Sequence, residues 1–298
     1  MRVVVTGSEG QLARALRERA VASGVTIVCV ARPQVDFERP ETIGPAVRAA
    51  RPDVVVNAAA YTMVDIAEVE QARATRINAD AAGEVAAGAA ACGAPIIQIS
   101  TDYVFDGSSG RPYVETDAPA PATAYGRSKL AGERAVAQAT DNHVILRTAW
   151  VHSPFGKNFV RTMLAIGLTC DAVDVVADQI GNPTYAPDAA DGILRVAQAL
   201  IRSPREMELR GLFHIVGGGD ATWADLAKAT FRAAEAFGRG PVAVRGVPSA
   251  QYPTPARRPV NSRLDCAKLL RTYAIALPDW RHSLDLCVAR LLGGEAKG

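Results

Sequence analysis

The sequence predicts an α/β fold, a doubly wound, Rossmann-like parallel sheet with a smaller C-terminal substrate lobe. Short runs of apolar, mainly β-branched residues alternate with helix-like segments through the first 150 residues. A turn with two glycines, Gly7-Ser8-Glu9-Gly10, joins the first such run to the first helix. Because the strand-like runs are apolar on both faces, we expect them to be buried between two layers of helices, as in a parallel sheet.

The elements of the first half are predicted from the period of their apolar residues and from the glycines and prolines that end them. Gly24 and Gly93 each stop a helix, and Pro52 follows another. The predicted strands are Val3–Thr6, Val25–Val30, Val54–Asn57, Ile96–Ser100 and His143–Arg147, and the predicted helices are Gln11–Ser23, Thr42–Ala50, Ala67–Cys92 and Tyr125–Ala139.

After about Trp150 this alternation loosens, and turns rich in proline and glycine separate three predicted helices. These helices are Pro187–Ile201, Thr222–Phe237 and Trp280–Leu292. We therefore expect a dinucleotide-binding domain over residues 1–150 and a substrate-binding lobe over residues 151–298. Part of the second half, about residues 187–202, could pack back on the first domain.

The composition excludes several classes of protein. With 49% hydrophobic and 21% charged residues and a net charge of +2, the chain has material for a core and no charge excess that demands nucleic acid or an anionic membrane. The five cysteines form no closely spaced pair, which argues against disulfide and zinc scaffolds. Neither a signal peptide nor an apolar run of membrane-spanning length is present, so we expect a cytoplasmic protein.

The first strand-to-helix turn has the features of a dinucleotide-binding turn. Gly7 permits a tight turn, Gly10 lets the backbone approach a pyrophosphate, and the small Ala13 lets the helix pack closely on the sheet. The phosphate would face the free N–H groups at the start of the helix. Glycine is common in any strand-to-helix turn, so the two glycines alone are weak evidence for a dinucleotide site. Their position at the first such turn of a doubly wound sheet strengthens that evidence.

The end of the second strand bears on the choice of cofactor. A carboxylate there would bind the ribose 2′-hydroxyl of NAD, but the strand ends in Val30-Ala31-Arg32-Pro33 and the first carboxylate is Asp36. Arg32 suits a 2′-phosphate, which favours NADP; the alternative is that Arg32 is a solvated loop residue.

Tyr125 and Lys129 form the predicted acid/base pair. They are four residues apart at the start of a helix and so share one helix face. We expect the ammonium to lower the pKa of the phenol, which makes Tyr125 a suitable proton donor to a carbonyl oxygen. This spacing also occurs by chance. Ser100 and Thr101, however, end a strand at the same edge of the predicted sheet, and a hydroxyl from one of them would face the same crevice.

Segments along nearly the whole chain match one family. The matching runs are Gly7–Leu12, Asn57–Asp65, Ser100–Gly107, Tyr125–Glu133, Arg147–Val151, Asn158–Val160, Asp178–Thr184 and Tyr252–Asp265. In these runs the sequence resembles the dTDP-4-dehydrorhamnose reductase family, within the extended short-chain dehydrogenases/reductases. The resemblance implies reduction of dTDP-4-dehydro-β-L-rhamnose to dTDP-L-rhamnose by NADPH or NADH.

The resemblance also implies roles for single residues. Tyr125 donates a proton to the C4 oxygen, Lys129 holds the nicotinamide ribose, and Thr101 bonds the oxygen at the reacting carbon. The expected cofactor contacts include Arg32, which suits the 2′-phosphate of NADP. The full set is Gly7, Gly10, Gln11, Leu12, Arg32, Asp36, Phe37, Ala58, Ala59, Ala60, Tyr125 and Lys129. The expected substrate contacts are Thr101, Asp102, Tyr103, Trp150, Arg257, Arg258 and Asn261.

Two departures from the family pattern shape further expectations. The family usually continues with Tyr-Gly after Trp150-Val151, whereas this chain has His152-Ser153. Better-studied members carry acidic residues for a magnesium ion at a dimer interface, whereas the first helix here has Arg14 and Ala15. We therefore predict no metal site and leave open whether the protein is a monomer or a homodimer.

Three other functions fit the same fold. The chain could reduce another nucleotide-linked 4-ketodeoxysugar, with the same catalytic pair and a different pocket. A non-catalytic, cofactor-binding regulatory subunit is disfavoured because Tyr125 and Lys129 are both present. A nucleotide-sugar epimerase that retains NAD is disfavoured because no acidic residue directly follows the second strand.

Overall fold

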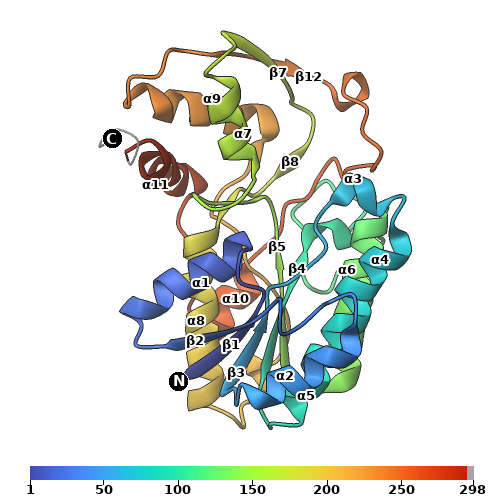
Figure 1. Ribbon diagram of the computed structural model, residues 1–298. Coiled ribbons are helices and arrows are strands. Elements are labelled where there is room, and N and C mark those ends of the chain that lie inside the picture. Colours follow the sequence, from blue (N-terminus) through green and yellow to red (C-terminus); the bar gives the residue numbers. More distant parts are fainter. Residues whose placement is uncertain (294–298) are drawn as a thin grey trace.

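The computed structural model describes residues 1–293 and has a six-stranded parallel sheet at its base (Figure 1). The strand order is β10-β5-β4-β3-β1-β2, and every neighbouring pair runs parallel. The predicted α/β fold with a doubly wound sheet is therefore confirmed. The strands are β1 (Arg2–Thr6), β2 (Thr26–Val30), β3 (Val54–Asn57), β4 (Ile96–Thr101), β5 (His143–Thr148) and β10 (Gly211–His214).

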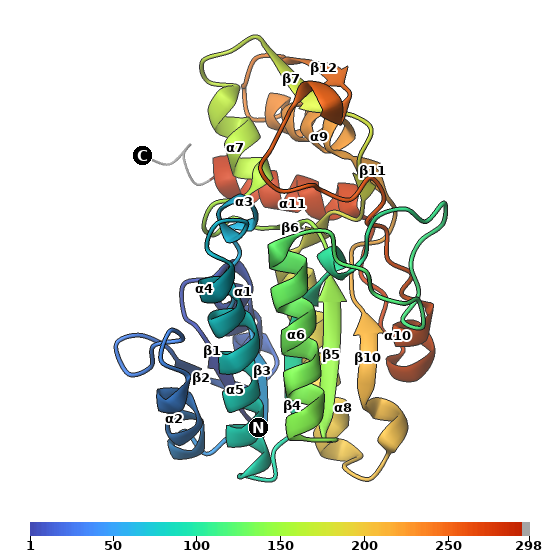
Figure 2. The same ribbon diagram turned by 90° about the vertical axis from the view of Figure 1, so that its right-hand side faces the viewer.

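Helices cover both faces of this sheet. Figures 1 and 2 show α1, α8 and α10 on one face and α2, α5 and α6 on the other. Within β1, Val3 and Val5 pack toward α1 and α8, whereas Val4 packs toward α2 and α5, so alternate side chains enter two separate cores. The bounds are α1 (Gln11–Ala22), α2 (Ile43–Ala49), α5 (Ala81–Ala90), α6 (Ala124–Ala139), α8 (Ala186–Arg202) and α10 (Ala267–Tyr273).

The helix predicted over Ala67–Cys92 is confirmed over residues 71–90 and is wrong at its start. After α3 (Val64–Ala67) the chain turns at residues 68–70, and α4 (Gln71–Thr75), a π-helical turn (Arg76–Asp80) and α5 then follow without a break. Asn78 lies in the π-helical turn, and its amide bonds both the N–H and the C=O of Tyr61 and also the hydroxyl of Ser128. The wide turn thus coincides with tertiary hydrogen bonds, as is common for single π-helical turns.

The upper lobe is smaller than the part that holds the six-stranded sheet, and it contains both helices and short strands (Figure 1). Its core gathers apolar side chains of α7, α9 and α11, including Val160, Leu226, Trp280 and Leu284. Around this core lie α7 (Phe159–Ile166), α9 (Trp223–Glu235), α11 (Trp280–Leu292), the parallel pair β7 (Ala172–Val176) and β12 (Ala243–Val247), and the short pairs β6 (Val151–His152) with β9 (Thr184–Tyr185) and β8 (Ile180–Gly181) with β11 (Ala221–Thr222). Elsewhere the described chain forms short 3-10 turns at Pro40–Thr42, Asp102–Val104, Met207–Leu209 and Ser249–Gln251.

The chain passes between the two lobes more than once. After β9 it returns as α8, which packs along α1 and is tied to it by the ion pair of Arg19 with Asp191 at 2.6 Å. It then adds β10 beside β5 before it re-enters the upper lobe. Residues of the second half therefore complete the sheet of the first.

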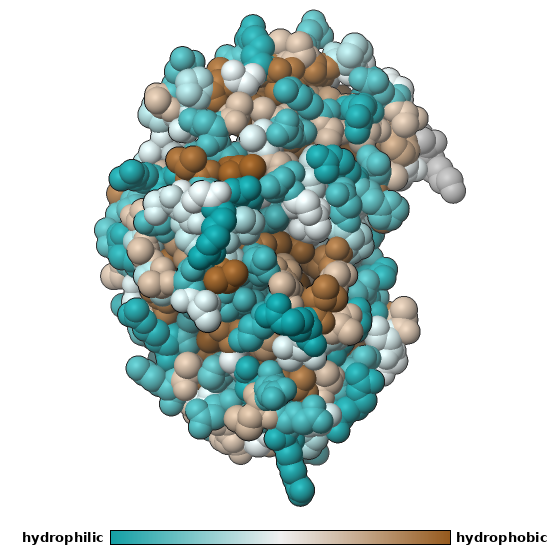
Figure 3. Space-filling model, turned by 180° about the vertical axis from the view of Figure 1, so that it is seen from behind, coloured by the Kyte–Doolittle hydropathy of each residue, from teal (hydrophilic) through white to brown (hydrophobic). Residues whose placement is uncertain are grey.

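The surface carries apolar residues in separate patches among hydrophilic ones, as the rear view in Figure 3 shows. Of the helices formed by residues 1–293, none combines the length and the apolar character needed to cross a membrane.

Candidate active site

The turn between β1 and α1 leaves room for a phosphate. Gly7 has a φ of +79°, a left-handed conformation that favours glycine. Gly10 precedes α1 without any side-chain cap, and a Cβ placed on it would meet no atom within 4 Å. The start of α1 therefore has no side-chain cap and has open space beside Gly10, an arrangement that suits a pyrophosphate.

The end of β2 carries a small cluster of charges. The guanidinium of Arg32 is 70% exposed and lies 3.1 Å from Asp36 and 3.6 Å from Glu38. A backbone hydrogen bond from Glu38, together with Arg32, holds the pKa of Asp36 below its usual value. Phe37 packs against the core beneath the sheet. Arg32 and Asp36 are thus close together at the strand end, and the guanidinium remains accessible.

The small residues after β3 lie next to this turn. Thr6 donates to Asn57 at 2.6 Å and accepts from the N–H of Ala59 at 3.0 Å. These bonds hold Ala58, Ala59 and Ala60 in a partly exposed segment beside Gly7, where an added Cβ on the glycine would meet the Cβ of Ala59 at 3.6 Å. The segment offers a surface without bulky side chains.

Tyr125 and Lys129 lie on α6, which begins directly after its N-cap, Thr123. Both side chains are buried. Burial raises the pKa of Tyr125 to about 12, and the hydroxyl of Thr101 opposes this rise. Burial lowers the pKa of Lys129 to about 8, and the carboxylate of Glu133 opposes that fall.

The expectation that Lys129 lowers the pKa of Tyr125 is wrong for the chain as described. The ammonium donates to the carbonyl oxygen of Ile99 at 2.6 Å, and burial dominates the phenol. Tyr125 is consequently a protonated donor at neutral pH.

Thr101 and Asp102 follow β4 beside Tyr125. Thr101 donates to Asp102 Oδ1 at 2.9 Å and also caps the 3-10 turn by accepting from the N–H of Tyr103. Burial raises the pKa of Asp102 to about 7, opposed by the hydroxyls of Thr101 and Ser262. Within the described residues Asp102 Oδ2 is buried and has no hydrogen-bond partner.

A buried ion pair behind this site was not predicted from the sequence. Glu133, one turn after Lys129, accepts two hydrogen bonds from Arg147 and one from Ser100. Ser100 therefore faces Glu133, and Thr101 is the strand-end hydroxyl that faces Tyr125. The spacing of Lys129 and Glu133 along α6 indicates that they share a helix face. The sequence does not show that Glu133 pairs with Arg147, because that pair forms only when α6 packs against β5.

Trp150 joins the two lobes. Its backbone has a φ of +47°, and its ring stacks on Trp223 of α9 with a centroid distance of 3.5 Å. Its indole N–H donates to Ser262 at 3.1 Å. His152, two residues later, is buried, and burial lowers its pKa to about 4, so the imidazole is neutral.

The two arginines of the proline-rich loop differ. Arg258 forms two hydrogen bonds with the carboxylate of Asp65, at 3.0 and 2.7 Å, and lies close to the phenol of Tyr103. Arg257 is exposed and makes no ion pair within residues 1–293. Tyr103 in turn meets Tyr125 edge to face, with ring centroids 5.5 Å apart. Arg258 is therefore held beside Asp65 and Tyr103, whereas Arg257 is exposed to solvent.

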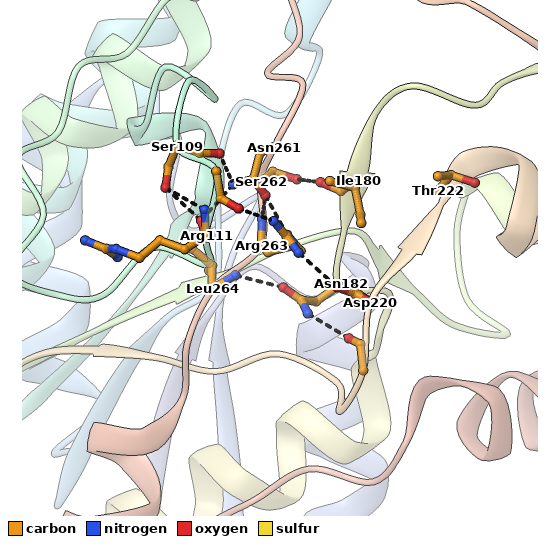
Figure 4. Close-up of polar contacts among 12 residues, drawn as sticks. Ser109, Arg111, Ile180, Asn182, Asp220, Thr222, Asn261, Ser262, Arg263 and Leu264 are labelled. Carbon is orange, nitrogen blue, oxygen red and sulfur yellow. Dashed lines mark hydrogen bonds and ion pairs between the residues drawn. The ribbon is translucent and has the colours of Figure 1, made fainter.

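Asn261 is a structural bridge rather than an open ligand (Figure 4). Its amide nitrogen donates to the carbonyl oxygens of Ser109 and Arg111, and its amide oxygen accepts twice from Arg263. The side chain is only 4% exposed. The expectation that Asn261 binds substrate directly therefore needs correction, because its hydrogen-bonding capacity is used within the chain.

Comparisons with known proteins show which family the chain resembles along nearly its whole length. The family model described as "RmlD substrate binding domain" matches residues 1–292. The dTDP-4-dehydrorhamnose reductase of Sinorhizobium fredii is 46% identical over 292 residues, 98% of each chain. A probable dTDP-4,6-dihydroxy-2-methyloxan-3-one 4-ketoreductase of Streptomyces antibioticus is 38% identical, over 99% of this chain and 97% of its own.

A solved structure of a dTDP-4-dehydrorhamnose reductase also matches nearly the whole chain. The dTDP-4-dehydrorhamnose reductase of Bacillus anthracis, in complex with NADP, superposes with a TM-score of 0.87 at 33% identity, over 97% of this chain and 99% of that one. With a family match and high identity over nearly the full length, the chain belongs to the dTDP-4-dehydrorhamnose reductase family.

Proposed function

We propose that this chain reduces the C4 keto group of dTDP-4-dehydro-β-L-rhamnose to give dTDP-L-rhamnose, with NADPH as the reductant. One observation carries the proposal. The buried phenol of Tyr125 lies beside the hydroxyl of Thr101 at the carboxyl edge of the sheet, where the glycine turn after β1 also opens. The reductase from Sinorhizobium fredii and the NADP-bound reductase from Bacillus anthracis support the substrate and the cofactor.

The protein's own residues would donate the proton and orient the oxygen that receives it. The cofactor, when bound, supplies a hydride to the carbonyl carbon. Tyr125, which is protonated at neutral pH, would deliver its phenolic proton to the C4 oxygen. Thr101 orients that oxygen. Lys129, charged below about pH 8, is assigned to the nicotinamide ribose.

The remaining site residues are assigned by position. The N–H groups of Gly10, Gln11 and Leu12 would hold the pyrophosphate, and Arg32 with Asp36 would meet the adenosine end. On the substrate side we assign Asp102, Tyr103, Trp150 and Arg258, with Arg257 at the solvent side and Asn261 as the support beneath them. Ala58–Ala60 would pack along the cofactor.

The division into lobes is part of the proposal. Residues 1–150 would bind the dinucleotide and residues 151–298 the sugar nucleotide, with Thr101, Asp102 and Tyr103 of the first part also facing the sugar. In the second part α8, β10 and α10 pack with the sheet. A cytoplasmic location, the absence of a metal and a monomeric or homodimeric state stay predictions.

A second substrate is supported by one comparison. The Streptomyces antibioticus relative is named for another dTDP-linked ketosugar, so the catalytic pair alone does not select the sugar. In that case Tyr125 and Lys129 would have the same roles.

The test is a direct assay with both sugars. The protein is mixed with NADPH and enzymatically prepared dTDP-4-dehydrorhamnose, and absorbance of the reduced cofactor is followed. We expect rapid oxidation of NADPH and formation of dTDP-L-rhamnose. If the second ketosugar is reduced with a much higher kcat/KM, the alternative replaces the rhamnose assignment; if neither sugar is reduced beside an active relative, the proposal fails.

A further inference from the structure

The side chain of Gln11 leaves the cofactor turn and enters the upper lobe. Gln11 is the first residue of α1, directly after Gly10. Its amide nitrogen donates to the carbonyl oxygen of Val151 at 3.3 Å. Its amide oxygen accepts from the hydroxyl of Ser153 at 2.7 Å and from the amide of Asn158 at 3.0 Å. The amide thus bonds three residues that are at least 140 positions away in sequence.

These partners form the entrance to the upper lobe. The segment 151–158 follows Trp150 directly, and Asn158 is the N-cap of α7, the first helix of that lobe. Ser153 is fully buried and holds the segment's own turn by accepting from the N–H of Phe155. We refer to residues 151–158 as the entrance segment.

Two further contacts hold the entrance segment against α1. The guanidinium groups of Arg14 and Arg290 both lie over the ring of Phe155, at 4.7 and 5.4 Å from its centroid. Arg290 of α11 forms two 2.7 Å hydrogen bonds with the carboxylate of Glu18. Gln11, Arg14 and Glu18 follow one another along one face of α1, so that face is the contact between the dinucleotide turn and the upper lobe.

From this geometry we propose that Gln11 is a positioning residue that transmits occupancy of the dinucleotide turn to the substrate lobe. The inference rests on the proposed function, since it requires a dinucleotide phosphate at the α1 N-terminus. A phosphate that bonds the first N–H groups of α1 orders the backbone of Gln11. The amide then orders the entrance segment and with it Trp150. Because coupling between two sites is reciprocal, sugar nucleotide and cofactor each raise the other's affinity.

Hydrogen–deuterium exchange of residues 151–166 with saturating NADP⁺ tests the coupling without turnover. In the wild type we expect NADP⁺ to slow exchange in this segment by about fivefold or more. In Gln11→Leu, studied at NADP⁺ concentrations that saturate the variant according to its own measured Kd, the slowing should be lost. Gln71→Leu, which removes an exposed glutamine of α4, is the matched control and should behave as the wild type.

Ser153→Ala breaks the same bond from the opposite side, away from the phosphate. It should lose the NADP⁺-dependent slowing as Gln11→Leu does, and the double variant should be no worse than either single one. In Ser153→Ala the KM for the ketosugar should rise by about tenfold while kcat changes by less than about threefold. Thermal unfolding without ligand checks that the variants are folded.

The possible outcomes distinguish failure of the coupling through Gln11 from failure of the proposed reductase function. If NADP⁺ binds the wild type but does not slow exchange in residues 151–166, the coupling is absent and only the inference falls. If Gln11→Leu loses NADP⁺ binding while Ser153→Ala keeps both binding and slowing, Gln11 acts on the cofactor alone, which also overturns the inference. If the wild type does not bind NADP⁺, the proposed function falls and the inference with it.

Discussion

Arg147 bonds both carboxylate oxygens of Glu133, at 2.9 and 2.7 Å, in a place where the two side chains are 3% and 6% exposed. Because Glu133 also accepts from Ser100, its carboxylate joins α6 to β4 and β5 directly behind Lys129. A buried pair of this kind gains little net stability, but the loss of one partner leaves a buried charge without compensation.

We therefore expect Arg147→Met to lower the free energy of unfolding by about 3–5 kcal/mol. Replacing both residues, Glu133→Leu with Arg147→Met, should cost clearly less than the single change. Urea unfolding at pH 7 measures both. The exposed pair of Arg245 and Asp174 is the control, and Arg245→Met should change stability by less than about 1 kcal/mol. A double variant as unstable as the single one would contradict this account.

Tyr125→Phe removes only the phenolic oxygen and keeps the ring that meets Tyr103 edge to face. Since this oxygen is the proposed proton donor, single-turnover reduction of the ketosugar should slow by about 10²–10⁴-fold. Binding of NADPH, measured by fluorescence, should change by less than about twofold, because the fold is retained. Tyr252→Phe, at an exposed tyrosine, is the control. Rapid turnover in Tyr125→Phe would mean that another group donates the proton.

Lys129 makes stability depend on pH in a defined direction. Burial lowers its pKa from 10.5 to about 8, so between these values the unfolded chain binds more protons at this residue than the folded chain. The free energy of unfolding therefore rises with pH in that window. We expect the difference between wild type and Lys129→Met to grow by about 3 kcal/mol in favour of the wild type from pH 7 to 10.5. Urea titrations at intervals of one pH unit would show it, and a flat difference would contradict it.

Gly126 lies where α6 passes the backbone of Tyr103. A Cβ at this position would lie 2.1 Å from the carbonyl oxygen of Tyr103, so Gly126→Ala must displace the helix start. We expect a loss of about 1–3 kcal/mol in stability and a fall in turnover, because Tyr125 is the preceding residue. Gly83→Ala in α5, whose Cβ would lie 3.5 Å from that of Ala135, should be tolerated. Circular dichroism melts and the NADPH assay measure both effects.

Much of the fold could be predicted because its signals are local. The predicted strand Val54–Asn57 and helix Trp280–Leu292 agree with β3 and α11 residue for residue. Their apolar periods and their flanking turn residues lie within single short segments. The strand β10 was missed because only four residues form it and its pairing with β5 spans more than 60 positions.

The candidate site divides in the same way. The spacing of Tyr125 and Lys129 along one helix could be predicted from the sequence. The pKa values of the two side chains could not. The pKa values depend on burial, and the partner of Lys129 is the carbonyl oxygen of Ile99, on a neighbouring strand. The bonds of Gln11 to the entrance segment likewise join residues that only the folded chain brings together.

The placement of β10 and α8 affects how the chain can fold as it is synthesised. When residues up to 185 have left the ribosome, the outer edge of β5 is unpaired and the face of the sheet that α8 covers is open. An unpaired edge and an uncovered apolar face are the features that lead nascent chains to associate wrongly. The nucleotide-binding half therefore cannot bury this face or pair this edge until residues 186–214 have been synthesised.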